Sequence, residues 1–548
     1  MQRSPRRRMR LVVTALLTLT VITSSLVTQP ASAKPVDRAV NLPPDGKVAF
    51  MLGQDSQTLA DFGADVLDVD PTFPAPAGIT LYTNLTGAPL AGIYQPVDFN
   101  VGRTLFPESL AEYGGALTVG LSLVDCSLTP LKAIAGSPDI APDVVRRYQA
   151  WTDELISWLR GSRRNVYLRI GYEFDGQWNC YQPKEYKEAY RHISERIDAL
   201  GADRIATVWQ SAAWPEVKPA PYNPTADGHW DLWYPGDDVV DWVGLSTFYG
   251  DSFDNHQWAC VPDENIAALP RAVQNDVLEF ARSHRKPVMI AEAAPQGYDL
   301  GELTAGCIFA SGQPWNNLAP VTVDQIWDQW FAEFFDYVRE NRDTIRAVSY
   351  INTDWDSQGN WQCNQQRCPN GYWADSRLQA NAEILARVKA ELRKPMWAPP
   401  APNRAPVTDM QLRSGVIEAE YETLPIGWSD AAGYGGFALP EPAASNDRHV
   451  MLLNFQRFER PSIVVPRIAH ASAVTVRYAA TNTVDDRGPL TYTLLVNGVS
   501  MGSHELDDTG GPGIYTDDRW DVTIPSRATI EIRLDGNIMW VDRIEVTR

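Results

Sequence analysis

The chain has 548 residues, a length that fits two to four domains, although one α/β barrel can take about 250 residues. Hydrophobic residues make up 44% and charged residues 21%, which excludes a disordered or fibrous protein. The formal net charge is −20, which disfavours nucleic acid or an anionic membrane as partner because their phosphates attract Lys and Arg. Nineteen Trp and 21 Tyr on so acidic a protein suit a neutral, ring-shaped ligand such as a sugar.

The N-terminus has the layout of an export signal. A basic stretch at residues 6–10 precedes an apolar run from Leu11 to Val27, and the small residues Ala31-Ser32-Ala33 form a cleavage pattern. A membrane anchor is the alternative, but the run contains several Thr and Ser and a cleavage site follows it. We therefore predict a signal peptide at residues 1–33 and a secreted, extracellular protein, exported by either the general or the twin-arginine route.

Export to an oxidising compartment permits disulfides, and the six cysteines allow fifteen pairings. The short loop between them makes Cys363–Cys368 the first expected pair, and Cys260–Cys307 is the second. The sequence has no CxxC motif or Cys/His cluster that would indicate zinc.

Eight short apolar runs predict strands that are buried on both faces, as in a parallel sheet. They are Val48–Leu52, Ile79–Thr83, Leu117–Leu123, Val166–Ile170, Ile205–Trp209, Trp242–Ser246, Val288–Ala291 and Ala347–Ile351. Helical stretches lie between several of them, most clearly at Val144–Arg160 and Pro183–Leu200. This alternation predicts a (β/α)8 TIM barrel, an α/β fold, over residues 34–394. An open doubly wound sheet is the alternative, but Gly53-Gln54-Asp55 after the first strand lacks the glycine pattern of a phosphate loop.

A second kind of structure is expected after the barrel. The proline-rich stretch that begins at Lys394 predicts a semi-rigid linker over residues 395–414. Beyond it, short alternating strands such as Ala473–Tyr478, Thr491–Val496 and Thr529–Leu534 predict an all-β sandwich of the jelly-roll type over residues 415–548.

Two of the predicted barrel strands end in a glutamate, at the edge where barrel enzymes carry their active sites. Glu173 follows the fourth strand and Glu292 follows the seventh. Glycoside hydrolysis needs two facing carboxyl groups, one protonated for the leaving oxygen and one ionised to attack the sugar carbon or to activate water. We predict Glu292 as the nucleophile and Glu173, whose aromatic surroundings should raise its pKa, as the general acid/base. Taken singly, either residue also fits an ion-pair partner or a helix cap.

Other strand ends supply candidate substrate-binding residues. Tyr249 follows the sixth strand and could donate a hydrogen bond to the nucleophile. Arg169 should point into the barrel and orient a carboxylate, although a purely structural ion pair fits equally well. Aromatic rings stack on the faces of sugars, and the candidates at the barrel mouth are Tyr172, Trp178, Trp209 and Trp355.

Two segments, Tyr167–Gly176 and Lys286–Glu292, resemble the acid/base and nucleophile segments of family 26 glycoside hydrolases, which include endo-β-mannanases, β-1,3-xylanases and some β-glucanases. The resemblance extends over about residues 45–390. It implies retaining hydrolysis through a covalent glycosyl-enzyme, with Glu173 as acid/base, Glu292 as nucleophile and Tyr249 supporting the nucleophile. Mannanases of the family usually have His before the acid/base glutamate, whereas this chain has Tyr172, which leaves xylan or another glycan open.

The C-terminal region resembles calcium-binding carbohydrate-binding modules of families 6 and 35. Residues 417–421 match the opening strand of those modules and residues 540–546 match the last one. The resemblance implies a structural Ca²⁺, which prefers oxygen ligands, held by Glu418, Glu420 and Asp542. Polar residues alternating along a solvated strand are the alternative. Sugar contacts would come from Tyr434, Trp520 and Asn537.

Together these features predict a secreted, monomeric, retaining endo-β-glycanase that binds polysaccharide, but not nucleic acid or membranes, and needs no cofactor for catalysis. Mannan or xylan from plants or algae is the expected substrate. Two other classes stay open. One is a barrel that binds glycan without cleaving it. The other is a transglycosylase or a hydrolase of furanose polymers, because the same carboxylate pair serves those reactions.

Overall fold

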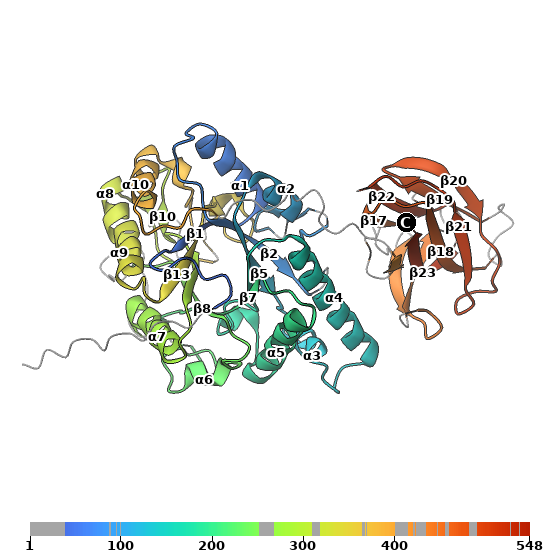
Figure 1. Cartoon of the computed structure of the whole chain (residues 1–548), viewed down its shortest axis with the longest axis horizontal. Coiled ribbons are helices and arrows are strands. Elements are labelled where there is room, and N and C mark those ends of the chain that lie inside the picture. Colours follow the sequence, from blue (N-terminus) through green and yellow to red (C-terminus); the bar gives the residue numbers. More distant parts are fainter. Residues whose placement is uncertain are drawn as a thin grey trace, which may run out of the picture.

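The computed structural model describes residues 39–547 with gaps at 87–88, 95, 99, 217, 251–267, 309–317, 364–367, 369, 401–414, 420–421, 423–433, 446–447, 455–459, 482–489, 527 and 536–537. It contains a barrel with helices around it and a second body made of strands (Figure 1). The expected signal peptide and most of the expected linker lie outside the described residues. Among the helices that are described, none has the length and apolar character needed to cross a membrane.

Eight parallel strands of the described residues close into a barrel in the order β1-β13-β9-β8-β7-β6-β5-β2. They are β1 (Ala49–Gly53), β2 (Gly78–Asn84), β5 (Ala116–Ser122), β6 (Val166–Ile170), β7 (Ile205–Ser211), β8 (Trp242–Thr247), β9 (Val288–Ala293) and β13 (Ile345–Ile351). Each predicted apolar run is one of these strands. The expected TIM barrel is therefore confirmed. The alternative prediction, an open doubly wound sheet, is wrong, because β1 pairs with both β2 and β13 and closes the ring.

Helices alternate with the strands and surround the barrel (Figure 1). They are α1 (Ser56–Phe62), α2 (Phe106–Glu112), α3 (Thr129–Ile134), α4 (Pro142–Gly161), α5 (Pro183–Ala199), α6 (His229–Trp233), α7 (Pro270–Ser283), α8 (Val323–Ile326), α9 (Ala332–Glu340) and α10 (Ala382–Leu392). The longest three, α4, α5 and α7, each begin at a proline, which lacks the backbone N–H that a first helical turn leaves unbonded. Helices α4 and α5 match the two predicted stretches.

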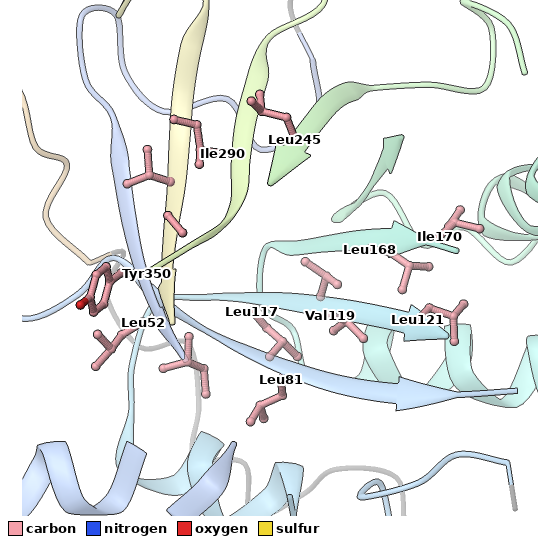
Figure 2. Close-up of a cluster of buried hydrophobic side chains, with 14 of the residues drawn as sticks. Leu52, Leu81, Leu117, Val119, Leu121, Leu168, Ile170, Leu245, Ile290 and Tyr350 are labelled. Carbon is pink, nitrogen blue, oxygen red and sulfur yellow. The ribbon is translucent and has the colours of Figure 1, made fainter. Parts of the chain in front are cut away.

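Alternate residues of the barrel strands point outward to the helices and inward to the barrel axis. Outward leucines and isoleucines, among them Leu81, Leu168 and Ile290, form the main hydrophobic core beneath the helices (Figure 2). Inward residues such as Trp242 and Met289 fill the lower interior in a separate apolar cluster. Toward the carboxyl ends of the strands the inward residues become polar, and this change positions the candidate site.

The C-terminal body consists of two antiparallel sheets, in the orders β15-β16-β23-β18-β21 and β17-β22-β19-β20, with β14 added on β23. Its strands are β14 (Gly415–Glu418), β15 (Tyr434–Pro440), β16 (Arg448–Asn454), β17 (Ser462–Ile468), β18 (Ala473–Ala480), β19 (Thr491–Val496), β20 (Val499–Glu505), β21 (Thr516–Trp520), β22 (Ala528–Leu534) and β23 (Ile538–Thr547). Both sheets contribute to one hydrophobic core that is separate from the barrel core. This arrangement is the expected β-sandwich.

Two disulfides are found among the described residues. Cys363–Cys368 confirms the first expected pair. Cys126–Cys180, which was not predicted, joins the loop after β5 to the segment after β6 that carries Glu173. Cys260 lies outside the described residues, so the Cys260–Cys307 pair stays a prediction.

Leu168 provides a test of the outward-facing core, because its side chain is fully buried on β6. We expect Leu168→Ala to lower the free energy of unfolding by about 2–5 kcal/mol, through lost burial and the cavity left behind. Val69, which is 74% exposed, is the control, and Val69→Ala should change the free energy of unfolding by less than about 0.5 kcal/mol. Urea unfolding followed by tryptophan fluorescence measures both. Equal midpoints for the two variants would contradict the assigned core.

Candidate active site

Five inward side chains toward the carboxyl ends of five barrel strands form a polar cluster; four of these strands, β6 to β9, are consecutive in the ring, and β5 separates β6 from β2. Four of them follow the alternation of their strands, whereas Glu292 comes directly after the inward Ala291 and faces the interior where the β8–β9 register shifts. Arg169 and Gln210 have no exposed surface, Ser246 is 3% exposed and Glu292 is 7% exposed. The cluster consists of Tyr82 on β2, Arg169 on β6, Gln210 on β7, Ser246 on β8 and Glu292 on β9.

Glu292 is held by a buried ion pair. Its Oε1 accepts a hydrogen bond from Nη2 of Arg169 and a second one, of 2.9 Å, from the hydroxyl of Tyr82. Removing two charges from water is costly unless they bond closely to each other and to further partners. Arg169 therefore gives the Glu292 carboxylate a fixed cationic partner and a fixed orientation.

Tyr82 is a contact of Glu292 that the sequence analysis missed, because it lies within a predicted strand and not at its end. The room for its ring comes from Gly120 on β5, where a Cβ atom would lie 2.4 Å from Cδ1 of Tyr82. The ring of Tyr172 packs edge-on against Tyr82, with 5.4 Å between the ring centroids. Both rings also pack on the Arg169 guanidinium, at 5.0 and 5.1 Å. Tyr172 thus supports the buried cation.

Glu173 lies in the tight turn that follows β6. Its φ of +51° is unusual for a residue other than glycine, and Gly171 before it has a φ of +53°. The turn is stabilised by Asn179, whose side-chain amide donates to the carbonyl oxygen of Glu173 at 2.8 Å. As a result the Glu173 side chain turns back over the barrel end, where it meets Ser246.

The Glu173 carboxyl group has a different environment from that of Glu292. Its Oε1 accepts a hydrogen bond of 2.8 Å from Oγ of Ser246, and its Oε2 accepts one of 3.1 Å from Nε1 of Trp178. Burial, together with the negative charge of Glu292, raises the pKa of Glu173 to about 8. Glu173 therefore carries a proton at neutral pH, as a general acid requires.

Asp175 fixes the loop that carries Glu173, a role the sequence analysis missed. This buried carboxylate accepts hydrogen bonds from Oγ of Ser211 at 2.6 Å and from the backbone N–H of Ala212 at 2.7 Å. Nε2 of His229 lies 3.1 Å from Oδ2, the oxygen that also accepts from Ser211. Because Ser211 and Ala212 stand at the end of β7, these bonds connect the Glu173 loop to the next barrel strand.

A continuous chain of hydrogen bonds joins the surroundings of the two glutamates. Nε of Arg169 donates to Oε1 of Gln210 at 2.7 Å, and Nε2 of Gln210 donates to Oγ of Ser246 at 3.0 Å. Ser246 in turn contacts Glu173 and is paired with Glu292 in the β8–β9 register. Gly244 makes room for this chain, because a Cβ there would lie 2.9 Å from Cβ of Gln210.

Trp178 is the exposed aromatic residue of the site, with 48% of its surface accessible. It folds back over Glu173 because Gly176 has no side chain; a Cβ at Gly176 would lie 2.5 Å from Cε2 of Trp178. Trp214, which was not predicted, packs edge-on against it at 5.7 Å. These two indoles lie on the Glu173 side of the site and are suited to stacking on a sugar ring.

Trp209 corrects one of the sequence expectations. Its neighbour Gln210 points inward, so Trp209 points outward into the helix layer. It is fully buried and stacks on Phe174 at 4.4 Å, with Tyr234 packed edge-on at 5.0 Å. A sugar cannot reach this ring, and the prediction that Trp209 binds substrate is wrong.

Trp355 and Tyr249 are both buried near the strand ends. Trp355 is 3% exposed, packs with Trp373 at 4.6 Å, and donates from Nε1 to Oγ of Ser376 at 3.0 Å. Tyr249 packs edge-on against Trp214 at 5.0 Å. Burial raises the pKa of Tyr249, and so do the nearby carboxyl groups of Glu173 and Glu216. The tyrosine hydrogen bond to Glu292 described above comes from Tyr82.

The expected calcium ligands find little support. Glu420 and the side chain of Glu418 lie outside the described residues. Asp542 is fully buried, accepts hydrogen bonds from Ser445, and pairs with Nη1 of Arg477 at 2.9 Å. Oδ2, the oxygen that faces Arg477, is buried and makes no hydrogen bond within the described residues, so the calcium role of Asp542 stays a prediction. Among the described residues no group of three or more His, Cys, Asp or Glu is arranged to hold a metal ion.

The expected sugar contacts of the C-terminal body are also mostly untested. The side chain of Tyr434 and all of Asn537 lie outside the described residues. Trp520 is 5% exposed and its ring stacks on His504, with 3.6 Å between the centroids. Trp520 is therefore part of the packing of the sandwich, and the prediction that it contacts sugar is wrong.

No family model matches the sequence. A β-1,3-xylanase from a Vibrio species is 35% identical over 358 residues, which are 65% of this chain and 67% of that enzyme. A β-1,3-xylanase from an Alcaligenes species is 34% identical over 358 residues, 65% of this chain and 66% of that enzyme. Among solved structures, a family 26 β-mannanase from Bacteroides ovatus covers 65% of this chain and 90% of its own, at 14% identity and a TM-score of 0.38.

The identity to the Vibrio enzyme is high enough, over enough of its length, to establish common ancestry, whereas the likeness to the mannanase is too low to carry an argument. The matched length is about that of the barrel. The chain therefore belongs to the family of these β-1,3-xylanases, which are glycoside hydrolases.

Proposed function

We propose that the protein is a secreted, retaining endo-β-glycanase that cleaves β-1,3-xylan. The observation that carries the proposal is the contrast between the two glutamates. Glu173 holds a proton at neutral pH, while Glu292 is paired with the buried Arg169. A protonated acid beside a carboxylate is the combination that double displacement requires.

In the proposed first step, a carboxylate oxygen of Glu292 attacks the anomeric carbon of the sugar. The bond to the leaving oxygen breaks as Glu173 gives its proton to that oxygen, and a covalent glycosyl-enzyme remains. In the second step Glu173, now ionised, removes a proton from water. The water oxygen attacks the same carbon and releases Glu292, so the configuration at that carbon is retained.

The choice of β-1,3-xylan rests on the two relatives, both named for that activity. It agrees with Tyr172 standing where mannanases of the family usually have His. Trp178 and Trp214 lie beside the acid/base residue and so beside the leaving part of the chain. There they would hold a sugar unit by stacking.

We extend the proposal to the C-terminal body, as a carbohydrate-binding module that holds the enzyme on its polymer. Tethering raises the local substrate concentration without changing the chemistry. Calcium in this module stays a prediction that depends on Glu418, Glu420 and Asp542. Secretion rests on the N-terminal sequence.

The nucleophile assignment is tested by Glu292→Ala. We expect wild type to release β-anomeric products from β-1,3-xylan, observed by proton NMR, and the variant to lose about 10³-fold or more in kcat. Glu391→Gln is the matched control, because Glu391 is also buried and ion-paired but lies on α10, and it should retain full activity. Equal activity of Glu292→Ala and wild type would overturn the assignment.

The raised pKa of Glu173 predicts the alkaline limit of activity. The acid step needs the protonated form, so kcat/KM should stay high through neutral pH and fall tenfold per unit as pH rises beyond about 8. A profile of kcat/KM from pH 5 to 10 measures this limit, with circular dichroism as a control for folding. A decline that begins near pH 4.5 would contradict the proposed environment of Glu173.

The module is tested by a chain that ends at residue 400. Because barrel and sandwich have separate hydrophobic cores, the shortened enzyme should fold. We expect it to keep its kcat/KM on soluble oligosaccharides and to lose most of its binding to insoluble β-1,3-xylan in a sedimentation assay. Equal sedimentation of both proteins would remove the binding role from the module.

A further inference from the structure

The hydrogen-bond chain between the two glutamates has a direction. Every hydrogen-bonding atom of an arginine side chain is a donor, so the atom of Gln210 that faces Arg169 is its amide oxygen. The other amide atom, Nε2, is then a donor, and it donates to Oγ of Ser246. Ser246 has one hydroxyl hydrogen, which it donates in a hydrogen bond to Oε1 of Glu173. The buried cation thus orients every donor along the chain.

This direction distinguishes the two oxygens of Glu173. Both oxygens accept one hydrogen bond, but Oε1 accepts the shorter one, of 2.8 Å from the buried Ser246 against 3.1 Å from Trp178 at Oε2; because a carbonyl oxygen accepts more strongly than a hydroxyl oxygen, this favours Oε1 as the unprotonated oxygen. Oε2 faces Nε1 of Trp178, which can only donate, so a hydroxyl at Oε2 can accept from the indole and still offer its own proton. Trp178 is half exposed, so Oε2 is the oxygen on the open side.

We propose that Ser246 and Gln210 are positioning residues that keep the Glu173 proton on Oε2, the oxygen that faces the glycosidic bond. The inference rests on the proposed acid/base role of Glu173 and deepens it. It also explains why an apparently inert serine and glutamine occupy the barrel end. Without the Ser246 hydroxyl the proton would distribute over both oxygens, and on Oε1 it would point away from the leaving group.

The Ser246 contribution must be separated from the other groups around Glu173. Glu292 on β9 and Arg169 on β6 act on it through their charges, and Tyr172 and Tyr249 lie close to it. Ser246→Ala leaves all four in place. It removes one hydrogen bond to the ionised form of Glu173, so the pKa of Glu173 should rise, by about one unit for a charge-assisted hydrogen bond.

The experiment compares Ser246→Ala with Ser246→Thr, which keeps the hydroxyl. Two β-1,3-linked aryl xylobiosides serve as substrates, one with a phenol leaving group that needs protonation and one with 2,4-dinitrophenol that does not. We expect Ser246→Ala to lose about tenfold or more in kcat/KM on the phenyl substrate and less than about twofold on the dinitrophenyl substrate. Its alkaline limit should move up by about one pH unit, and Ser246→Thr should restore both values.

Equal losses on the two substrates, or an unchanged alkaline limit, would overturn the positioning role. A second measurement does not need activity: carbon-13 NMR titration of the Glu173 carboxyl, identified by its absence in Glu173→Gln. A higher pKa in Ser246→Ala than in wild type supports the inference, and an equal pKa overturns it. If wild type cleaves no xyloside, the proposed function fails while the titration still decides the role of Ser246.

Discussion

The buried ion pair between Arg169 and Glu292 is the interaction on which the rest of the site depends. Each charge loses several kcal/mol of hydration on burial, and their attraction restores it only if the remaining donors and acceptors are also bonded. Tyr82 bonds the glutamate and Gln210 bonds the arginine. The need to keep these bonding partners in place explains the inward glycine at position 120, because a larger residue there would displace Tyr82.

The same arginine gives the two glutamates different properties. Glu292 bonds to the cation directly, whereas Glu173 meets it only through Gln210 and Ser246. Glu173 therefore feels burial and the charge of Glu292 more strongly than any compensating positive charge, and its pKa rises. This difference is the basis of the separate roles proposed for them. This contrast arises from the positions of neighbouring side chains, since the two residues are chemically identical.

Rigidity around Glu173 comes from elements outside the polar cluster. Asp175 bonds its loop to the end of β7, and the Cys126–Cys180 disulfide joins the segment that follows to the loop after β5. In the proposed mechanism such a preorganised side chain does not have to be ordered by the substrate, so binding energy is kept for the reaction. The C-terminal sandwich has its own hydrophobic core.

The sequence by itself determined the barrel strands and the positions of both glutamates, because apolar runs and strand ends are local features of the chain. It also yielded the Cys363–Cys368 pair, since the loop between them is short. It could not identify Tyr82, Gln210 or Ser246 as partners, and it misjudged Trp209. Which inward side chains meet depends on strand register and on closure of the ring, and a shift of one residue reverses inside and outside. Only the tertiary structure decides that register, because it is set by packing between segments far apart in the chain.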